Sequence, residues 1–395
     1  MALQPAAGAR DLNPLEVDSN RWLCDQLAEV YRLWGYAEVA PPAVERLETL
    51  EAGGGINDRE LVRLAAAEPL GLRPEMTASI ARAACTRFAQ RPRPLRLWSS
   101  GPVFRIVEGD TGQRFEEQLQ SGVELLGQGQ DPNQAGAEDA ELLRLLLACL
   151  RRLRINAEHQ PVLLVGHHAV LQALLDQVPA EQRMATRKAL INYDPLALDA
   201  LEVPGHQRQG LQQLMRLRGE PQAVLYQLEQ QLGPNPLLKQ LTRTLELVAP
   251  LAERQGVRLQ LDPSFQPHFE LYDGLVLKLV CRGLEAPLQI ASGGRYDALL
   301  ARFGGVASGL GFGVDVEAVR ELLGLEAVAP ERPAPLLVSC QGPAQLPAAL
   351  ELLEQLQAGG QPAELLHQPC ASAAEAERIA GERGCAGARW IGAAA

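Results

Sequence analysis

The chain has 395 residues, of which 47% are hydrophobic, and its formal net charge is −11. This length predicts two or three domains, and the lack of a run of about twenty apolar residues argues against a membrane span. The first residues lack the basic start and apolar stretch of a signal peptide, so we expect a cytoplasmic protein. The acidic balance disfavours a nucleic-acid partner, because phosphate binding requires a basic surface.

An amphipathic helix is predicted at residues 14–35, where apolar side chains recur at helical spacing up to Gly35. Residues 36–40 favour a strand that ends at Pro41-Pro42, because proline cannot donate to a strand ladder. A glycine loop at 53–55 follows.

Two strand-like runs at 95–106 and 118–127 predict an antiparallel hairpin with a long polar connection. A helix at about 136–154 and a short buried strand at 161–165 come next. The chain then looks mainly helical from residue 169 to residue 230, and we interpret about 169–240 as a helical insertion.

Three further strands are predicted after the insertion, at 256–261, 270–281 and 286–292. We expect Gly293-Gly294 to open a helix that continues through Leu299-Leu300. A glycine-rich strand at 308–316 should then lead into a helix at about 317–324.

The proline-rich stretch 326–335 predicts a linker between a domain of residues 1–325 and a small module of residues 336–395. Strands and helices alternate in the module: strand 336–340, helix 346–357, strand 363–366, helix 372–383 and strand 388–391. This alternation predicts a small parallel sheet with helices.

The seven cysteines are scattered, odd in number and without metal-ligand spacing, so we expect reduced thiols. His167 and His168 stand in a predicted strand-to-helix turn without a third ligand nearby. We therefore expect neither a metal site nor a cofactor.

One face of the predicted hairpin carries polar groups, because side chains alternate along a strand and place Gln120, Gly122 and Glu124 together. Arg105 lies near the end of the partner strand, and Glu75 and Thr77 come just before a helix. Carboxylates, an amide, a hydroxyl and an arginine suit a zwitterion such as a free amino acid. The alternative is a set of solvated side chains on an open sheet face.

Several strings of residues, in this order and spacing, resemble histidyl-tRNA synthetase, a class II aminoacyl-tRNA synthetase, up to residue 325. They are Gly8–Pro14, Gly101–Arg105, Gln120–Glu124, Ser292–Asp297 and Gly309–Val314. The resemblance implies an α+β fold: a class II synthetase-like antiparallel sheet flanked by helices, with a helical insertion and a small C-terminal α/β domain like a shortened anticodon-binding domain. The helix at 14–35 and its following strand resemble the first class II motif, which builds a dimer interface.

The same resemblance implies a histidine-binding site. The family's histidine-binding positions fall on Glu75, Thr77, Arg105, Gln120, Glu124 and, as a looser match, Tyr272.

The chain departs from a working synthetase where ATP chemistry needs fixed arginines. Ala318 stands where the third-motif arginine belongs, and Arg320 lies roughly 200° further around the helix. Pro267 aligns with the family's catalytic arginine, and the stretch 106–117 has one extra residue and less basic character. Each lost contact commonly costs ~10²–10³ in rate, so we predict no catalytic residues.

The C-terminal module also departs from a tRNA-binding domain. From Pro333 onward it carries three arginines against six glutamates, a charge balance that disfavours an anticodon stem.

This combination resembles the ATP phosphoribosyltransferase regulatory subunits, which are paralogues of histidyl-tRNA synthetase. That resemblance implies a hetero-oligomer with a short-form catalytic subunit, acting in the first step of L-histidine biosynthesis, with L-histidine as a possible effector. The histidine pocket is then either functional or vestigial, with histidine bound at a subunit interface instead. A free-standing histidine-binding paralogue and an active histidyl-tRNA synthetase are the alternatives.

Overall fold

The computed structural model describes residues 4–53, 59–109, 112–127, 132–267, 271–305, 308–324 and 333–393. The chain divides into two compact units, Met1–Ala329 and Pro330–Ala395. Some predicted features lie outside the described residues: two glycines of the predicted loop (54 and 55), the hairpin tip (110 and 111), residues 268–270 and most of the predicted linker (326–332).

A mixed sheet forms the centre of the first unit. In its described part, eight strands lie in the order β1-β4-β5-β10-β9-β8-β6-β7, and neighbours run antiparallel except for the pairs β1–β4 and β6–β7. The strands are β1 (Ala37–Glu38), β4 (Leu95–Gly109), β5 (Gly112–Leu126), β6 (Val162–His167), β7 (Arg258–Leu261), β8 (Leu275–Arg282), β9 (Pro287–Arg295) and β10 (Gly309–Asp315).

The β4–β5 hairpin is longer than the sequence suggested. Its pairing runs from Leu95 opposite Leu126 out to Gly109 opposite Gly112, so the expected long polar connection is wrong. Aromatic packing across the strands supports this extension, since the rings of Phe104 and Phe115 lie 5.9 Å apart.

The prediction that Gly293-Gly294 opens a helix is also wrong, because both glycines lie inside β9. The helix α11 (Asp297–Arg302) begins only after Tyr296. A Cβ on Gly293 would overlap the carbonyl oxygen of Gly311 and lie 2.6 Å from Cα of Phe312. These glycines therefore permit close packing of β9 on β10 and do not start a helix.

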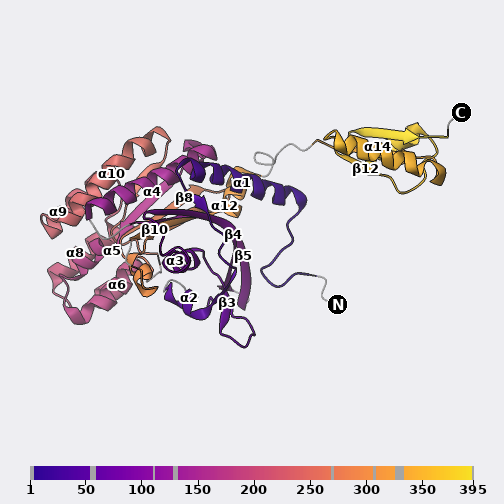
Figure 1. Cartoon of the computed structure of the whole chain (residues 1–395). Helices are drawn as coiled ribbons and strands as arrows, with labels where there is room; N and C mark the ends of the chain where they lie inside the picture. Colours follow the sequence, from indigo (N-terminus) through magenta and orange to yellow (C-terminus); the bar gives the residue numbers. More distant parts are fainter. Residues whose placement is uncertain are drawn as a thin grey trace. The chain divides into compact units, whose positions relative to one another are not determined.

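Helices cover the two faces of the sheet (Figure 1). One face carries α1 (Pro14–Leu33), α4 (Pro132–Arg152), α10 (Pro236–Arg254) and α12 (Val316–Leu323). The other face carries α2 (Leu47–Ala52), α3 (Thr77–Cys85) and α11, with a two-stranded antiparallel sheet in the described residues, β2 (Val44–Arg46) and β3 (Leu70–Leu72).

The first helix forms where its apolar spacing predicted it. Asn13 caps its start: the Asn13 side chain accepts from the N–H of Glu16 at 3.0 Å, and the Glu16 carboxylate accepts from the N–H of Asn13 at 2.9 Å. Leu23, Leu27 and Tyr31 are fully buried against the sheet. Because capping and amphipathicity agree, α1 anchors the larger core of the first unit.

The region between β6 and β7 is mainly helical, as predicted. Its further helices are α5 (His168–Leu175), α6 (Arg183–Ile191), α7 (Pro195–Asp199), α8 (Gly205–Arg216) and α9 (Pro221–Leu232). Across the described residues, the structure contains no helix long and apolar enough to cross a membrane.

The second unit has its own small core. Its described strands β11 (Leu336–Cys340), β12 (Ala363–Leu365) and β13 (Gly387–Ile391) form a parallel sheet in the order β12-β11-β13, which confirms the predicted arrangement. The helices α14 (Leu346–Ala358) and α15 (Ala373–Glu382) pack into two separate clusters, which contain Val338 and Leu337 respectively. Because these neighbours on β11 point to opposite faces, one helix covers each face.

Candidate functional site

The structure brings the predicted binding residues together in one cavity. The cavity lies on the sheet face that α3 and α11 cover, and its volume is about 70 Å³, several times what one water molecule requires. Its lining includes Glu75, Thr77, Arg105, Gln120, Glu124 and Tyr272. The open sheet face considered as an alternative is therefore covered, although the ligand of these six residues stays a prediction.

The floor of the cavity comes from β5 and β10. Gln120, Gly122 and Glu124 face it, as strand alternation predicted, whereas Val123 packs into the core on the other face. A Cβ on Gly313 would overlap the Gln120 amide, and one on Gly311 would overlap the Glu124 carboxylate. Glycines on β10 therefore leave room for the polar side chains of β5.

Glu124 is the most deeply buried charged residue of the site, with 4% of its surface exposed. Its Oε1 accepts a hydrogen bond from Thr77 Oγ1 at 2.6 Å, and its Oε2 accepts one from the hydroxyl of Tyr296. Burial raises the pKa of this carboxyl to about 8, although both hydroxyl bonds act in the opposite direction. At neutral pH the empty cavity therefore favours the protonated acid.

Glu75 lies at the start of α3. Its carboxylate accepts hydrogen bonds from the backbone N–H groups of Thr77 and, at 3.0 Å, Ala78. Burial raises the pKa of Glu75, and the N–H bonds and the charge of Arg105 counteract that rise. This residue thus both satisfies N–H groups at the start of α3 and presents its carboxyl group to the cavity.

Arg105 supplies the positive charge of the site. Its Nε donates to the carbonyl oxygen of Pro74 at 3.0 Å, which fixes the guanidinium beside the start of α3. Among the described lining residues it is the one cation, against the carboxylates of Glu75 and Glu124. Tyr272 completes the wall as a neutral phenol, because burial raises its pKa.

Sequence reasoning missed Tyr296 as a member of the site. This tyrosine is 1% exposed, lines the cavity and donates to Glu124. A signal was present, because Tyr296 belongs to the Ser292–Asp297 string that carries the family resemblance. Nothing in that string indicates which strand its hydroxyl would reach.

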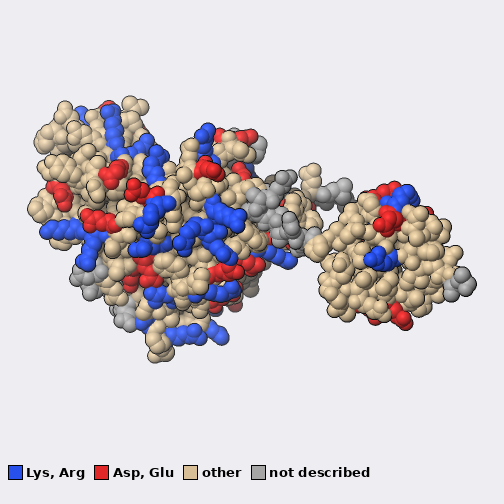
Figure 2. All heavy atoms as spheres, turned by 90° about the horizontal axis from the view of Figure 1, so that it is seen from above, with Lys and Arg blue, Asp and Glu red and all other residues tan. Residues whose placement is uncertain are grey.

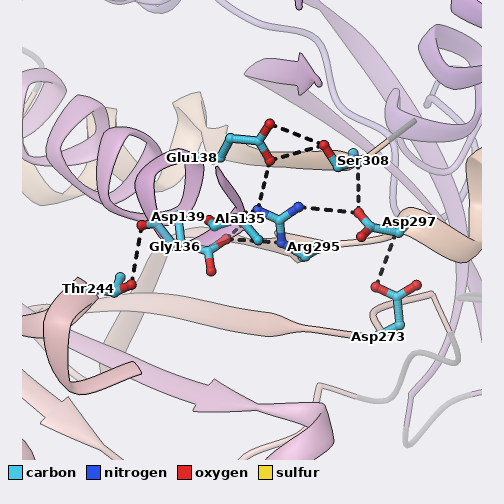
Figure 3. Close-up of polar contacts among 10 residues, drawn as sticks. Ala135, Gly136, Glu138, Asp139, Thr244, Asp273, Arg295, Asp297 and Ser308 are labelled. Carbon is cyan, nitrogen blue, oxygen red and sulfur yellow. Dashed lines mark hydrogen bonds and ion pairs between the residues drawn. The ribbon is translucent and has the colours of Figure 1, made fainter. Parts of the chain in front are cut away.

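The neighbouring Arg295 forms a buried ion cluster with carboxylates of α4 and α11 (Figure 3). Its Nη2 lies 2.7 Å from Asp139 Oδ1 and 3.1 Å from Glu138 Oε2, and its Nη1 lies 3.4 Å from Asp297 Oδ1. Burial raises the pKa of Asp139 to about 6, while the guanidinium opposes the rise. The cluster ties the end of β9 to α4, 156 residues earlier in the chain.

Asp297 is itself held from two sides in this cluster. Its Oδ1 accepts from the N–H of Gly309 at 2.8 Å, and its own N–H donates to Asp273 at 3.1 Å. The Ser292–Asp297 string therefore contributes Tyr296 to the wall of the cavity. Its residues Arg295 and Asp297 hold that wall in place.

The arginine at position 320 does not reach the cavity. Its guanidinium donates to Asn20 Oδ1 at 2.7 Å and lies 3.5 Å from the carboxylate of Glu16, so it ties α12 to α1. Neither Arg320 nor Ala318 is among the cavity residues. Arg320 therefore serves a structural contact, away from the predicted ligand site.

No metal-binding cluster of three His, Cys, Asp or Glu side chains occurs in the described ranges. His167 ends β6 and caps α5, where its Nδ1 accepts from the N–H of Ala169 at 3.2 Å. Burial lowers the pKa of His167 to about 4, so it is a neutral structural residue at pH 7. All seven cysteines are free thiols.

The C-terminal unit shows few charged side chains on the face seen in Figure 2. Arg378 and Arg383 lie 2.5 Å and 3.1 Å from glutamate oxygens of the same unit, those of Glu382 and Glu364. Arg389, the remaining arginine of the described residues 333–393, is exposed. The surface of this unit therefore has little free positive charge for a polyanion.

Comparison with known proteins places the chain among synthetase-like sequences. The family described as histidyl-tRNA synthetase matches residues 8–319. Proteins named ATP phosphoribosyltransferase regulatory subunit are similar over 99% of this chain and 100% of their own length: one from Synechococcus sp. (strain RCC307) at 53% identity and one from Prochlorococcus marinus (strain MIT 9303) at 50%.

Solved structures share the fold over the whole chain. An ATP phosphoribosyltransferase regulatory subunit/histidyl-tRNA synthetase from Bacillus halodurans C is 26% identical, with a TM-score of 0.81 and full coverage of both chains. A histidyl-tRNA synthetase from Nostoc sp. PCC 7120 is 21% identical, with a TM-score of 0.76 over 100% of this chain and 92% of the other. The predicted class II synthetase-like α+β fold is confirmed.

Proposed function

Because the chain belongs to the family of ATP phosphoribosyltransferase regulatory subunits, we propose that it is a non-catalytic subunit that activates a short-form ATP phosphoribosyltransferase. In this role it supports the first step of L-histidine biosynthesis and transmits feedback by histidine. The catalytic subunit joins ATP to phosphoribosyl pyrophosphate, and this chain supplies no reacting group.

The charged side chains that line the cavity are the main support for this proposal. A site that activates an amino acid with ATP needs fixed cations to stabilise charge on the α-phosphate. The described cavity lining offers Arg105 alone, beside two carboxylates, and Arg320 is committed to Asn20 and Glu16. The described lining therefore offers polar groups that suit an amino acid. It offers no cation beyond Arg105 that would suit a triphosphate.

Histidine is the ligand that we propose for the cavity. Arg105 suits its carboxylate, and Glu75 and Glu124 suit its ammonium group or imidazole N–H. A bound ligand shifts an equilibrium between two arrangements of a complex only if it binds them unequally. Feedback inhibition therefore requires that the inactive arrangement of the complex bind histidine more tightly than the active arrangement does.

We further propose that two copies of this chain pair through α1 and β1. The strand β1 lies at an edge of the sheet with Ala37 and Glu38 exposed, and Leu33 at the end of α1 is 86% exposed. An uncovered edge strand beside a large exposed apolar side chain is suited to pairing.

A cytoplasmic location and the absence of a nucleic-acid partner complete the proposal. Seven free thiols suit a reducing compartment. The paired arginines of the C-terminal unit argue against a tRNA anticodon stem as its ligand.

The test is a mixing assay with the short-form ATP phosphoribosyltransferase of the same organism, which follows phosphoribosyl-ATP formation. We expect activity to appear only when this chain is added and to fall on addition of histidine. A catalytic subunit that is fully active alone and indifferent to this chain would contradict the proposal and favour a free-standing histidine-binding protein. Histidine-dependent exchange of pyrophosphate into ATP by this chain alone would instead identify an active synthetase.

A further inference from the structure

The two carboxylates of the cavity have chemically different partners. Glu75 accepts from the backbone N–H groups of Thr77 and Ala78, which donate hydrogen bonds and cannot accept them. These N–H groups begin α3, where the helix dipole also favours negative charge. The surroundings of Glu75 therefore suit an ionised carboxylate.

Glu124 has hydroxyl partners on both of its oxygens. Thr77 Oγ1 and the hydroxyl of Tyr296 each lie within hydrogen-bond distance of it. A hydroxyl can donate or accept, so the same geometry satisfies a carboxylate and a carboxylic acid. Unlike Glu75, this residue can change its protonation state without losing a partner.

The charges around Glu124 leave it without a counter-ion. The titratable side chains that act on it or are acted on by it are Glu75 on the loop before α3 and three tyrosines, Tyr36, Tyr272 and Tyr296. Arg105 on β4 also lines the cavity. The tyrosines are neutral because burial raises their pKa. The positive charge of Arg105 acts on Glu75. Within the described residues, no guanidinium, ammonium or imidazole forms an ion pair with Glu124.

We propose that the cavity binds a ligand through a cationic group that takes the place of the proton on Glu124. The ligand class is then a molecule with an ammonium group, which is already protonated at pH 7, so each binding event releases the proton of Glu124 to solvent. The O–H bond of the Glu124 acid breaks, the electron pair stays on the carboxylate, and the ligand cation forms an ion pair with it. This inference rests on the proposed histidine site and adds the way in which that site recognises its ligand.

The energetics of burial agree with the geometry. Because burial raises the pKa of Glu124 to about 8, the acid is mainly protonated in the empty cavity at pH 7. A cation within about 4 Å favours the charged form of a carboxyl and lowers its pKa again. Because the pKa of Glu124 is high before binding and falls when the cation binds, binding at pH 7 should release close to one proton per ligand.

The experiment is calorimetry of the full-length protein with L-histidine at pH 7, in phosphate and in Tris buffer. These buffers take up protons with very different heats, so the difference between the two binding heats reports the number of protons released. We expect close to one proton for the natural chain and none for Glu124→Gln, whose amide keeps the hydroxyl bonds but cannot ionise. Glu229→Gln, at an exposed position of α9 that does not line the cavity, is the matched control and should leave proton release unchanged.

The binding heats of the natural chain test the proton exchange even if the variants do not fold. Binding with equal heats in both buffers would overturn the proton exchange while leaving the histidine site intact. Proton release that persists in Glu124→Gln would come from another group. That result would also overturn the proposed proton exchange at Glu124. An absence of binding at millimolar histidine would contradict both the proton exchange and the proposed histidine site. It would leave the proposed activation of the catalytic subunit untested by this experiment and still open to the mixing assay.

Discussion

The hydroxyl of Tyr296 donates a hydrogen bond to the Glu124 carboxylate across 172 positions of sequence. It joins the residue that follows β9 to the C-terminal end of β5, with β10 between the two strands. Both side chains are almost fully buried. This contact therefore helps to position one wall of the cavity, and it joins two residues that line the cavity.

Removal of that hydroxyl should destabilise the fold. Tyr296→Phe leaves a buried oxygen of Glu124 without its donor, which commonly costs ~1–3 kcal/mol in the free energy of unfolding. Urea denaturation followed by circular dichroism measures the change. Tyr226→Phe, at a tyrosine that is 64% exposed, is the matched control and should be neutral. Equal stability of the two variants would mean that the Tyr296 contact contributes nothing.

The Arg295 cluster should be sensitive to loss of its one cation. Arg295→Gln leaves the buried carboxylates of Asp139 and Glu138 uncompensated, and such a loss typically costs ~3–5 kcal/mol. The same change at Arg46, whose pair with Glu68 is exposed at 3.7 Å, should alter stability by less than ~1 kcal/mol. Thermal denaturation of both variants tests the contrast, and a stable Arg295→Gln protein would argue against the cluster as an anchor.

Gly311 should not tolerate even a methyl group. Gly311→Ala would drive its Cβ into the Glu124 carboxylate and the backbone oxygen of Val123, and backbone cannot move aside cheaply. We expect a poorly folded protein or one unable to bind histidine. Gly210→Ala provides the control, because this glycine lies within α8 with open space around it. That variant should gain up to ~1 kcal/mol in stability from helix propensity. Melting temperatures that shift in the same direction would contradict the argument.

The stability of the fold should depend on pH through Glu124. Its pKa is raised from an ordinary 4.5 to about 8 on folding, so between these values the folded state binds more protons than the unfolded one. Stability from this group is therefore fully present below about pH 4.5 and is lost as pH rises through about 8, by at most ~1.4 kcal/mol per pH unit. The difference in unfolding free energy between the natural chain and Glu124→Gln isolates the effect. A difference that stays constant from pH 5 to pH 8 would show that Glu124 is ionised throughout.

The sequence by itself determined the features that depend on local pattern. Alternation along β5 placed Gln120 and Glu124 on one face, and the helical spacing of apolar residues located α1. The expectation that Pro267 and Ala318 stand in place of the family's arginines likewise comes from the sequence alone, and it stays a prediction. These features need only the period of a strand or helix, or the identity of a residue within a recognised string.

Only the tertiary structure decided which distant segments meet. The pairing of β10 with β5 and β9 brings Tyr296 to Glu124, and the packing of α4 brings Asp139 to Arg295. It also showed that Gly293 serves strand packing, because the obstruction comes from Gly311, which is not a sequence neighbour. Local periodicity specifies the face of an element on which a side chain lies. The partner on that face is set by sheet register and helix packing, which depend on the whole core at once.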